Sequence, residues 1–455
     1  MAIDVCEFEV GAKAVARVAA KWRRRVFCVV LLLGVAGLGQ SHPAGGAPTD
    51  DADADRRALD RARIELELGR PDLALIHLRS VGVSQIERSG ADVGVLGVLG
   101  LGSSNRILTR AVSGEVVHVE WCTEGTPGVA LTTGNCECVQ VVKGASLDSV
   151  SVSTGGFSIR KLSWSGRLGR LAVVAPDGSL HVGKAEGGSS WQRLVALDGR
   201  AWVARWLHDG RLIVGAGGEA ELVDPISPTV TRAWSQHDDP IEGFLEISPL
   251  RVLVREMSGG VFLLDLRSQT PTRTCLLRGD SRGLVSALRV GGAGGGPVWL
   301  ARTDGVLGLA DPLDTPPRGA RVVLGPGPAV VGLVATKSGV LSLDDVGCLR
   351  HWSVRGELIA GRRVGSTQQA ATCLESVVVG GVACVVIGWA SGSLEVVRVD
   401  NLRSAGVIGI GKSSPLDMRA FGNDTLLAVF EDAVVRVDFS TANLAADLKE
   451  TFRVR

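Results

Sequence analysis

Hydrophobic and polar positions alternate in short runs along most of this chain, and one stretch shows the repeating unit clearly. Residues 171–197 consist of an apolar run, an Asp177-Gly178 turn, an alternating run, a polar loop and a final run led by Trp191. An Asp-Gly pair readily takes the positive φ angles of a tight hairpin turn, and alternating apolar residues on both sides are typical of paired strands. The stretch therefore predicts consecutive antiparallel β-strands.

The same kind of turn recurs along the chain. Equivalent turns can be placed at Asn135-Cys136, Asp177-Gly178, Gly217-Gly218, Gly259-Gly260, Asp304-Gly305, Val346-Gly347, Ser391-Gly392 and Glu431-Asp432. Counted from the second member of each pair, the turns therefore recur with a period of about 40–45 residues, which is the length of one propeller blade. Such a period with four strands per unit predicts an all-β fold, an eight-bladed β-propeller.

The ends of such a ring need a partner, because an open propeller leaves two unpaired sheet edges. Residues 106–112 alternate and are predicted to form an early strand that pairs with the last blade. A seven-bladed ring is the alternative, if the unit at 115–142 with its unusual turn is only an addition to the fold.

Tryptophan residues occupy repeated positions within these units. Trp121, Trp164 and Trp206 precede the turns at 136, 178 and 218 by similar spacings, which places them on the innermost strands. Trp191 and Trp234 follow the turns at 178 and 218, which places them on the outermost strands. Large planar side chains at one height fill the space between twisted sheets, so we interpret them as structural. A ligand-stacking role is the alternative.

The amino-terminal segment, residues 1–40, differs in character. It carries Lys13, Arg17, Lys21 and the run Arg23-Arg24-Arg25, and the stretch 26–38 that follows has no charged residue. A basic region before a short apolar run is typical of a secretory signal, although a bilayer span needs about 20 residues. We expect a signal peptide or membrane anchor, with membrane contact through residues 26–38. A wrongly assigned start or a buried helix is the alternative.

Two further segments separate this region from the repeats. Residues 41–55 are small, acidic and proline-containing, which predicts a solvated linker. Helical periodicity over 56–82 predicts two helices, 56–68 and 71–81, and the pattern resembles one tetratricopeptide-type hairpin; its residues are Leu59, Ala62, Gly69, Ala74 and Leu78. Such a hairpin would pack on the propeller, act as a spacer or bind a partner. The propeller itself is predicted over 93–455.

Charge and cysteine content limit the function classes. The formal net charge is +1, and no basic stripe with interleaved aromatic residues is found, so the sequence does not favour nucleic-acid binding. Of nine cysteines, Cys6 and Cys28 lie before residue 40, which leaves seven. An odd number without regular spacing is no disulfide framework and argues mildly against an oxidising compartment.

Few residues suggest chemistry. Cys136-x-Cys138 is the one close cysteine pair, but a metal site usually needs two further ligands at matching spacing. The histidines are scattered over different units, and the glycine-rich run 291–296 lacks the lysine and helix of a phosphate-binding loop. We therefore expect no catalytic residue, no metal site and no cofactor. Arg160 and Arg205, on inner strands, are the candidates for groups that face the axis.

The repeated pattern allows a resemblance to be stated. Asp177-Gly178-Ser179-Leu180 leading to Trp191, and Gly218 leading through Asp224 to Trp234, look like the repeat of pyrroloquinoline-quinone-type propellers. The pattern is also compatible with WD40 repeats, although His351-Trp352 is found in place of a Trp-Asp pair. With an export segment, residues 105–440 resemble the propeller component B of the outer-membrane protein assembly machinery.

That resemblance implies a rigid scaffold that binds a membrane-associated assembly complex through its loops. The family often has a lipidated cysteine after its signal, whereas Cys28 lies inside the apolar run, which argues against lipid anchoring. We expect a non-enzymatic scaffold for protein partners in envelope protein assembly, exported to the periplasm or tethered to a membrane. A WD40-type platform of an intracellular complex is the first alternative, and an exported propeller enzyme is the second.

Overall fold

The computed structural model describes most of the repeat region of the chain. It covers residues 107–439 except for gaps at 123–127, 135–137, 145, 187–189, 195–199, 228, 236–238, 268–271, 278–283, 290–295, 312–318, 366–368, 380–381, 411–412 and 423. Arg57, Ala58, Arg61 and His77 are also described, and all four are helical. The segments predicted over 1–40 and 41–55, and the rest of the predicted hairpin, lie outside the described residues.

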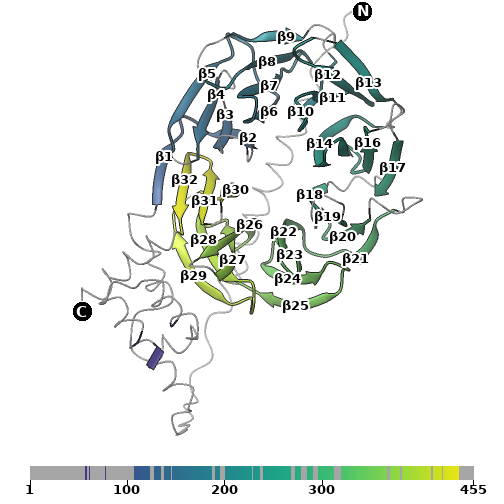
Figure 1. Cartoon of the computed structure of the whole chain (residues 1–455). Coiled ribbons are helices and arrows are strands. Elements are labelled where there is room, and N and C mark those ends of the chain that lie inside the picture. The colour runs from purple at the N-terminus through teal and green to yellow at the C-terminus, as the bar shows by residue number, and fades with distance from the viewer. Residues whose placement is uncertain are drawn as a thin grey trace, which may run out of the picture. The chain divides into compact units, whose positions relative to one another are not determined.

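The described strands form eight four-stranded antiparallel sheets, which follow one another around a ring (Figure 1). Blades 1 to 4 consist of β2 (Val116–Cys122), β3 (Gly128–Thr133), β4 (Cys138–Lys143) and β5 (Ser149–Ser153); β6 (Lys161–Ser165), β7 (Arg170–Val174), β8 (Leu180–Lys184) and β9 (Gln192–Leu194); β10 (Val203–Trp206), β11 (Leu212–Ala216), β12 (Glu219–Asp224) and β13 (Thr229–Ser235); and β14 (Ile241–Ser248), β15 (Arg251–Glu256), β16 (Val261–Asp265) and β17 (Thr272–Leu277).

Blades 5 to 8 repeat this arrangement, and the last one also uses the first strand of the chain. They consist of β18 (Leu284–Arg289), β19 (Val298–Arg302), β20 (Leu307–Ala310) and β21 (Arg321–Leu324); β22 (Val330–Thr336), β23 (Gly339–Asp344), β24 (Cys348–Ser353) and β25 (Leu358–Arg363); β26 (Ala371–Val379), β27 (Val382–Trp389), β28 (Ser393–Arg398) and β29 (Ser404–Gly409); and β30 (Pro415–Phe421), β31 (Thr425–Phe430), β32 (Ala433–Asp438) and β1 (Ile107–Ala111).

The predicted closure of the ring is confirmed. β1 pairs with β32 in antiparallel register, from Ile107 opposite Val437 to Ala111 opposite Ala433. The backbone continues this pairing, because Val112 N–H donates to the carbonyl of Asp432 at 2.8 Å. The unit at 115–142 supplies three strands of a complete four-stranded blade, so the ring has eight blades and the seven-bladed alternative is wrong.

Seven of the eight predicted turns lie among the described residues, and each of these joins the second and third strands of a blade. The turn predicted at Asn135-Cys136 lies outside the described residues, and the strands that flank it in sequence, β3 and β4, pair. Gly178, Gly305 and Gly392 have φ angles of 78°, 80° and 84°, in the left-handed region that favours glycine. The sequence pattern therefore located the central hairpin of each blade.

Burial increases from the rim to the middle strands of each blade. Every residue of β3, β11 and β23 is buried, because neighbouring blades cover both faces of these strands. Every residue of β25, an outermost strand, is exposed. Hydrophobic clusters join adjacent blades, and one of them closes the ring by packing Val129 and Leu131 of blade 1 with Leu427 and Val434 of blade 8.

Two of the predicted inner-strand tryptophans fill space between blades. Trp164 packs with Ala130 and Val141 of blade 1, and a Cβ atom at Gly128 would lie only 3.0 Å from its ring. Trp206 packs in the same way with the core of blade 2. Trp191 lies one residue before β9, beside the outermost strand and not in it. These positions agree with the structural interpretation.

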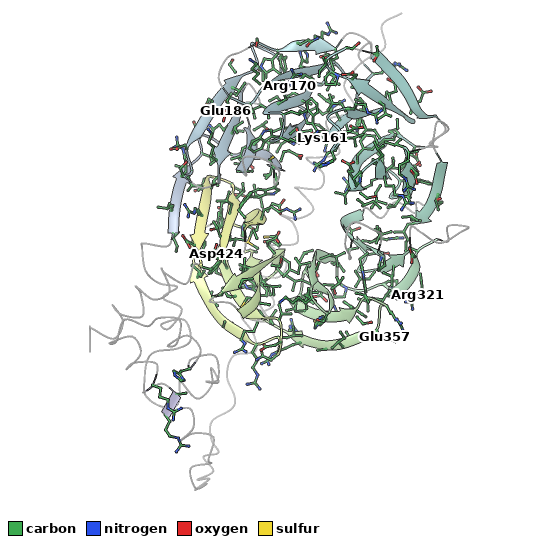
Figure 2. All side chains as sticks on the ribbon, in the orientation of Figure 1. Lys161, Arg170, Glu186, Arg321, Glu357 and Asp424 are labelled. Carbon is green, nitrogen blue, oxygen red and sulfur yellow. The ribbon has the colours of Figure 1, made fainter. Side chains whose placement is uncertain are left out.

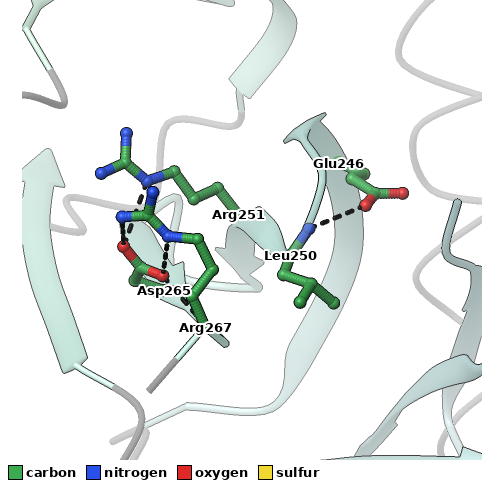
Figure 3. Close-up of polar contacts among 5 residues, drawn as sticks. All are labelled: Glu246, Leu250, Arg251, Asp265 and Arg267. Atoms are coloured by element: carbon green, nitrogen blue, oxygen red, sulfur yellow. Dashed lines mark hydrogen bonds and ion pairs between the residues drawn. The ribbon is translucent and has the colours of Figure 1, made fainter. Parts of the chain in front are cut away.

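Local polar contacts hold the connections within a blade, as blade 4 illustrates (Figure 3). The carboxylate of Glu246 accepts the backbone N–H of Leu250 at 3.1 Å and so closes the turn between β14 and β15. At the end of β16, Asp265 accepts Arg267 Nε at 2.8 Å and Arg251 Nε at 3.1 Å. These hydrogen bonds, above all the one from Arg267, lower the pKa of Asp265 to about 2.

Among the described residues, no helix has the length and apolar character needed to cross a bilayer. The predicted membrane contact through residues 26–38 lies outside these residues.

Candidate functional site

The first strand of each blade faces the axis of the ring, so the axis is where side chains of different blades converge (Figure 1). Successive first strands lie side by side around most of the ring. Along each strand, successive side chains point to opposite faces of the sheet. The position of a residue in the strand therefore decides which face its side chain lies on. Lys161 of β6 lies at the inner border of the ring (Figure 2).

Arg205, one of the two residues predicted to face the axis, takes part in a contact between blades. Its guanidinium, on β10, forms an ion pair with the carboxylate of Glu120 on β2. These two strands belong to blades 3 and 1, and the Glu120 carboxylate also accepts a hydrogen bond from the backbone of Trp164 in blade 2. The pair therefore spans three consecutive blades.

Glu120 is the more buried partner, with 13% of its side chain exposed against 36% for Arg205. Burial raises the pKa of Glu120, while the guanidiniums of Arg205 and Arg419 act in the opposite direction. The neighbouring charge of Asp417 adds to the upward shift. The axis thus holds a carboxylate whose charged form depends on the cations around it.

Arg160, the second predicted candidate, makes a different contact. Its guanidinium carbon lies 4.0 Å from the ring centroid of Trp202, in a cation–π arrangement. Arg160 precedes β6 and Trp202 precedes β10, so the contact joins blades 2 and 3. The structure therefore does not bring Arg160 and Arg205 together in one contact.

On the other side of β2, contacts join the first blade to the last. Trp121 Nε1 donates to Asp417 Oδ2 at 2.7 Å, and its ring centroid lies 6.0 Å from that of Phe421. Both partners belong to β30, so this hydrogen bond bridges the two blades where the ring closes. Trp121 thus combines the predicted packing role with a specific polar contact.

A third pair continues this arrangement into blade 7. Arg419 Nη1 of β30 lies 3.5 Å from Glu375 Oε2 of β26. Burial raises the pKa of Glu375, and the charge of Arg419 counteracts that shift. Together with the two contacts of β2, this pair forms a set that we call the axial network, made of Glu120, Trp121, Arg205, Glu375, Asp417 and Arg419.

Sequence reasoning missed four members of the axial network: Glu120, Glu375, Asp417 and Arg419. A signal for Glu120 was available, because it directly precedes the inner-strand Trp121, just as Arg205 directly precedes Trp206. Ser163 holds the equivalent position before Trp164, and its Oγ accepts the backbone N–H of Trp206 at 3.1 Å. The residue before each inner-strand tryptophan therefore makes a polar contact with another blade.

Of the predicted Cys136-x-Cys138 pair, Cys136 lies outside the described residues. Cys138 lies on β4 as a free thiol. Within the described part of the chain, no group of three or more His, Cys, Asp or Glu side chains is arranged to hold a metal ion.

Comparisons with known proteins agree on the fold. No family model and no curated protein matches this sequence. The computationally designed protein Ika8 is similar in structure, with a TM-score of 0.53 and 16% identity over 73% of this chain and 98% of the designed one. The C-terminal WD40 domain of Sif2 has a TM-score of 0.52 and 13% identity, over 72% of this chain and 98% of that domain. At these identities the likeness concerns the fold alone, which is that of WD40-like β-propellers.

Proposed function

We propose that this WD40-like propeller is a non-enzymatic scaffold that binds protein partners. The observation that carries this proposal is the axial network, in which charged and polar groups of first strands are bound to one another across blades. Such pairing stabilises the arrangement of the blades and leaves the loops and rim to contact other molecules. A propeller built in this way presents a stiff ring of attachment sites.

The architecture supports this role in a second way. Each blade is held by short hairpins, and hydrophobic clusters run continuously from one blade to the next. A rigid surface binds with little loss of conformational entropy, which favours affinity for a partner. The solved WD40 domain of Sif2 shares this framework.

The proposal is tested with the full chain, tagged and recovered from intact membrane fractions by cross-linking and affinity capture. We expect a defined set of proteins that is retained after washing and is competed by untagged protein. The matched control is Glu120→Gln, which alters a charge at the axis and leaves loops and rim unchanged. Equal capture by both forms supports a scaffold. Loss of capture in the axial variant, with the fold intact, would place the binding site at the axis and contradict this account.

For the biological setting, we extend the proposal to envelope protein assembly. Its support is the basic segment followed by the uncharged run at 26–38, together with the resemblance of the repeats to the outer-membrane assembly component. A fusion of residues 1–60 to alkaline phosphatase provides the test. The enzyme is active only after export, so an active fusion supports this setting and a silent one refutes it.

A second candidate setting is an intracellular complex, in which the chain acts as a WD40-type platform. The observation in its favour is that Cys138, Cys348, Cys373 and Cys384 are free thiols. Free thiols are ordinary in a reducing compartment, whereas exported proteins tend to form disulfides. A silent phosphatase fusion would favour this setting over the first.

A further inference from the structure

The outermost strand of blade 6, β25, offers an open edge on the rim of the ring (Figure 1). It pairs with β24 on one side only, since it is the last strand of its sheet. All six of its residues are exposed, including Leu358 at 57% and Ile359 at 54% of their surface. An exposed edge with unpaired backbone groups and apolar side chains is a surface on which an extended segment can add as a strand.

A cleft adjoins the end of this strand, between blades 6 and 7. Its volume is about 510 Å³, and its described lining includes Arg362, Arg363, Gln369, Trp389, Glu395 and Ser404. The floor is fixed, because Trp389 is buried and its Nε1 donates to the buried carboxylate of Glu395 at 3.1 Å. The cleft is therefore held in shape by interactions beneath it.

Arg362 and Arg363, at the end of β25, differ from Arg350 on β24 and Arg398 on β28. Arg350 forms an ion pair with Asp344 at 2.8 Å, and Arg398 forms one with Asp400. Within the described residues, neither Arg362 nor Arg363 has an ion pair or hydrogen bond from its side chain. Two adjacent cations thus line the cleft, on an exposed strand, without a carboxylate of their own.

We propose that the edge of β25 and the adjoining cleft bind an extended, acidic segment of a partner protein. The segment runs along β25, with apolar side chains against Leu358 and Ile359 and carboxylates on Arg362 and Arg363. This inference rests on the proposed scaffold function and names the surface and the class of partner.

The charges of the cleft also set the order of residues in the partner. The carboxylate of Glu395 lies on the floor, whereas the two arginines are exposed. A carboxylate that entered deeply would meet like charge, so the acidic groups stay at the arginines and a neutral side chain enters the cleft. Val407 lines the cleft and is 49% exposed, which suits an apolar or amide side chain.

Two arginines beside apolar residues on β25 favour a protein partner over a polyanion such as nucleic acid. A polyanion would gain from further cations along its path, but the remaining residues of β25 are Leu358, Ile359, Ala360 and Gly361. Two apolar side chains followed, two residues later, by two cations fit a polypeptide that carries an apolar pair and an acidic pair at the same spacing. The arginines also keep the free edge from pairing with other copies, a role that is compatible with partner binding.

The test uses a phage library of random short peptides, selected on the immobilised full chain. The enriched peptide is then synthesised with a fluorescent label and titrated against three proteins: the natural chain, the variant Arg362→Glu/Arg363→Glu, and the control Arg110→Glu/Arg193→Glu. The control reverses the same charge at exposed positions of β1 and β9, on other blades. Circular dichroism checks that all three are folded.

We expect peptides that carry an apolar pair and an acidic pair two residues apart, whose affinity falls at least about tenfold in the Arg362/Arg363 variant and stays within about twofold in the control. A peptide with alternate backbone nitrogens methylated should also bind more weakly in the one register whose N–H groups face β25, and nearly unchanged in the other, because strand addition uses only the N–H groups on that side. The inference is overturned if selected peptides lack acidic residues, if both variants bind equally, or if methylation in both registers has no effect.

Failure of this inference can be told from failure of the scaffold function. If the Arg362→Glu/Arg363→Glu variant still captures the partners of the natural chain from membrane fractions, the scaffold function stands and the β25 site is wrong. If the natural chain captures nothing, the scaffold function is wrong. Capture that is lost in this variant and kept in the control supports both.

Discussion

Replacing Trp121 with phenylalanine tests whether the axial network holds the ring closed. The change removes the indole N–H that donates to Asp417 at 2.7 Å between blades 1 and 8. A hydrogen bond to a charged group contributes about 1.5–3 kcal/mol, and Trp121 is only partly buried, which favours the lower part of that range. We therefore expect Trp121→Phe to lower the free energy of unfolding by about 2 kcal/mol.

The measurement is urea unfolding followed by far-ultraviolet circular dichroism, arranged as a double-mutant cycle with Asp417→Ala. Each single variant removes one partner, and the double variant removes both, so the two effects should be less than additive by about 1 kcal/mol or more. Native-state hydrogen exchange should show faster exchange in β1 and β32 of the Trp121→Phe variant than in blade 4.

A matched control comes from the rim. Trp191 Nε1 donates to the backbone carbonyl of Ser153 at 2.7 Å, a bond of equal length between blades 2 and 1. Trp191→Phe should lower stability by about 1 kcal/mol, because its acceptor is uncharged, and should be additive with Asp417→Ala. The reasoning is refuted if Trp121→Phe and Asp417→Ala are also additive to within about 0.4 kcal/mol.

Three further changes test individual features of the fold. Gly365→Ala should destabilise the chain by about 2–4 kcal/mol in urea unfolding, because Gly365 has a φ of 71° and a Cβ atom there would lie 2.3 Å from the ring of Trp389. Asp265, with its pKa lowered to about 2, should contribute stability that is complete above about pH 4 and lost as the pH falls towards 2. The side chain of Asp265 is 19% exposed and solvent screens its ion pairs, so we expect a loss of about 1 kcal/mol, measured by thermal unfolding between these pH values. Cys373, whose pKa burial raises to about 12, should resist alkylation in the native protein at neutral pH, whereas the exposed Cys275 should be modified quickly, as mass spectrometry can follow.

Controls for these changes are available in the same chain. Gly325→Ala should have little effect, because no atom lies within 4 Å of its Cβ position. Asp265→Asn should remove the loss of stability at low pH, and an unchanged pH profile would contradict the assignment. Equal alkylation rates for Cys373 and Cys275 in the folded protein would show that Cys373 is accessible.

The repeating architecture could be predicted because its signals are local. A turn such as Asp177-Gly178 and the alternation around it lie within a few residues of each other, so eight copies and their spacing indicate eight blades without any knowledge of distant contacts. The closing strand β1 was also predictable, because its alternation and its place before the first blade left the last blade as its partner.

The candidate site was predicted only in part, because its contacts join residues far apart in sequence. Arg205 and Glu120 are separated by 85 positions, and Trp121 and Asp417 by 296. Alternation shows which residues share a face, but the pairing of charges depends on where the blades lie around the ring. The partner of Arg160 could not be predicted from the sequence either, because it is the aromatic ring of Trp202 on the next blade.

Ring closure through β1 has a consequence for synthesis on the ribosome. Ala111 is made before any of the eight blades is complete, whereas its partner Ala433 belongs to the last of the described strands to be made. At about 5–20 residues per second, roughly a quarter of a minute to a minute passes between the two. Throughout that time the first seven blades can assemble in order, while β1 and the facing side of blade 1 wait with an apolar surface uncovered. Nascent chains are therefore most exposed to aggregation and most in need of a chaperone at blade 1, and truncated products that end before residue 433 keep that surface open.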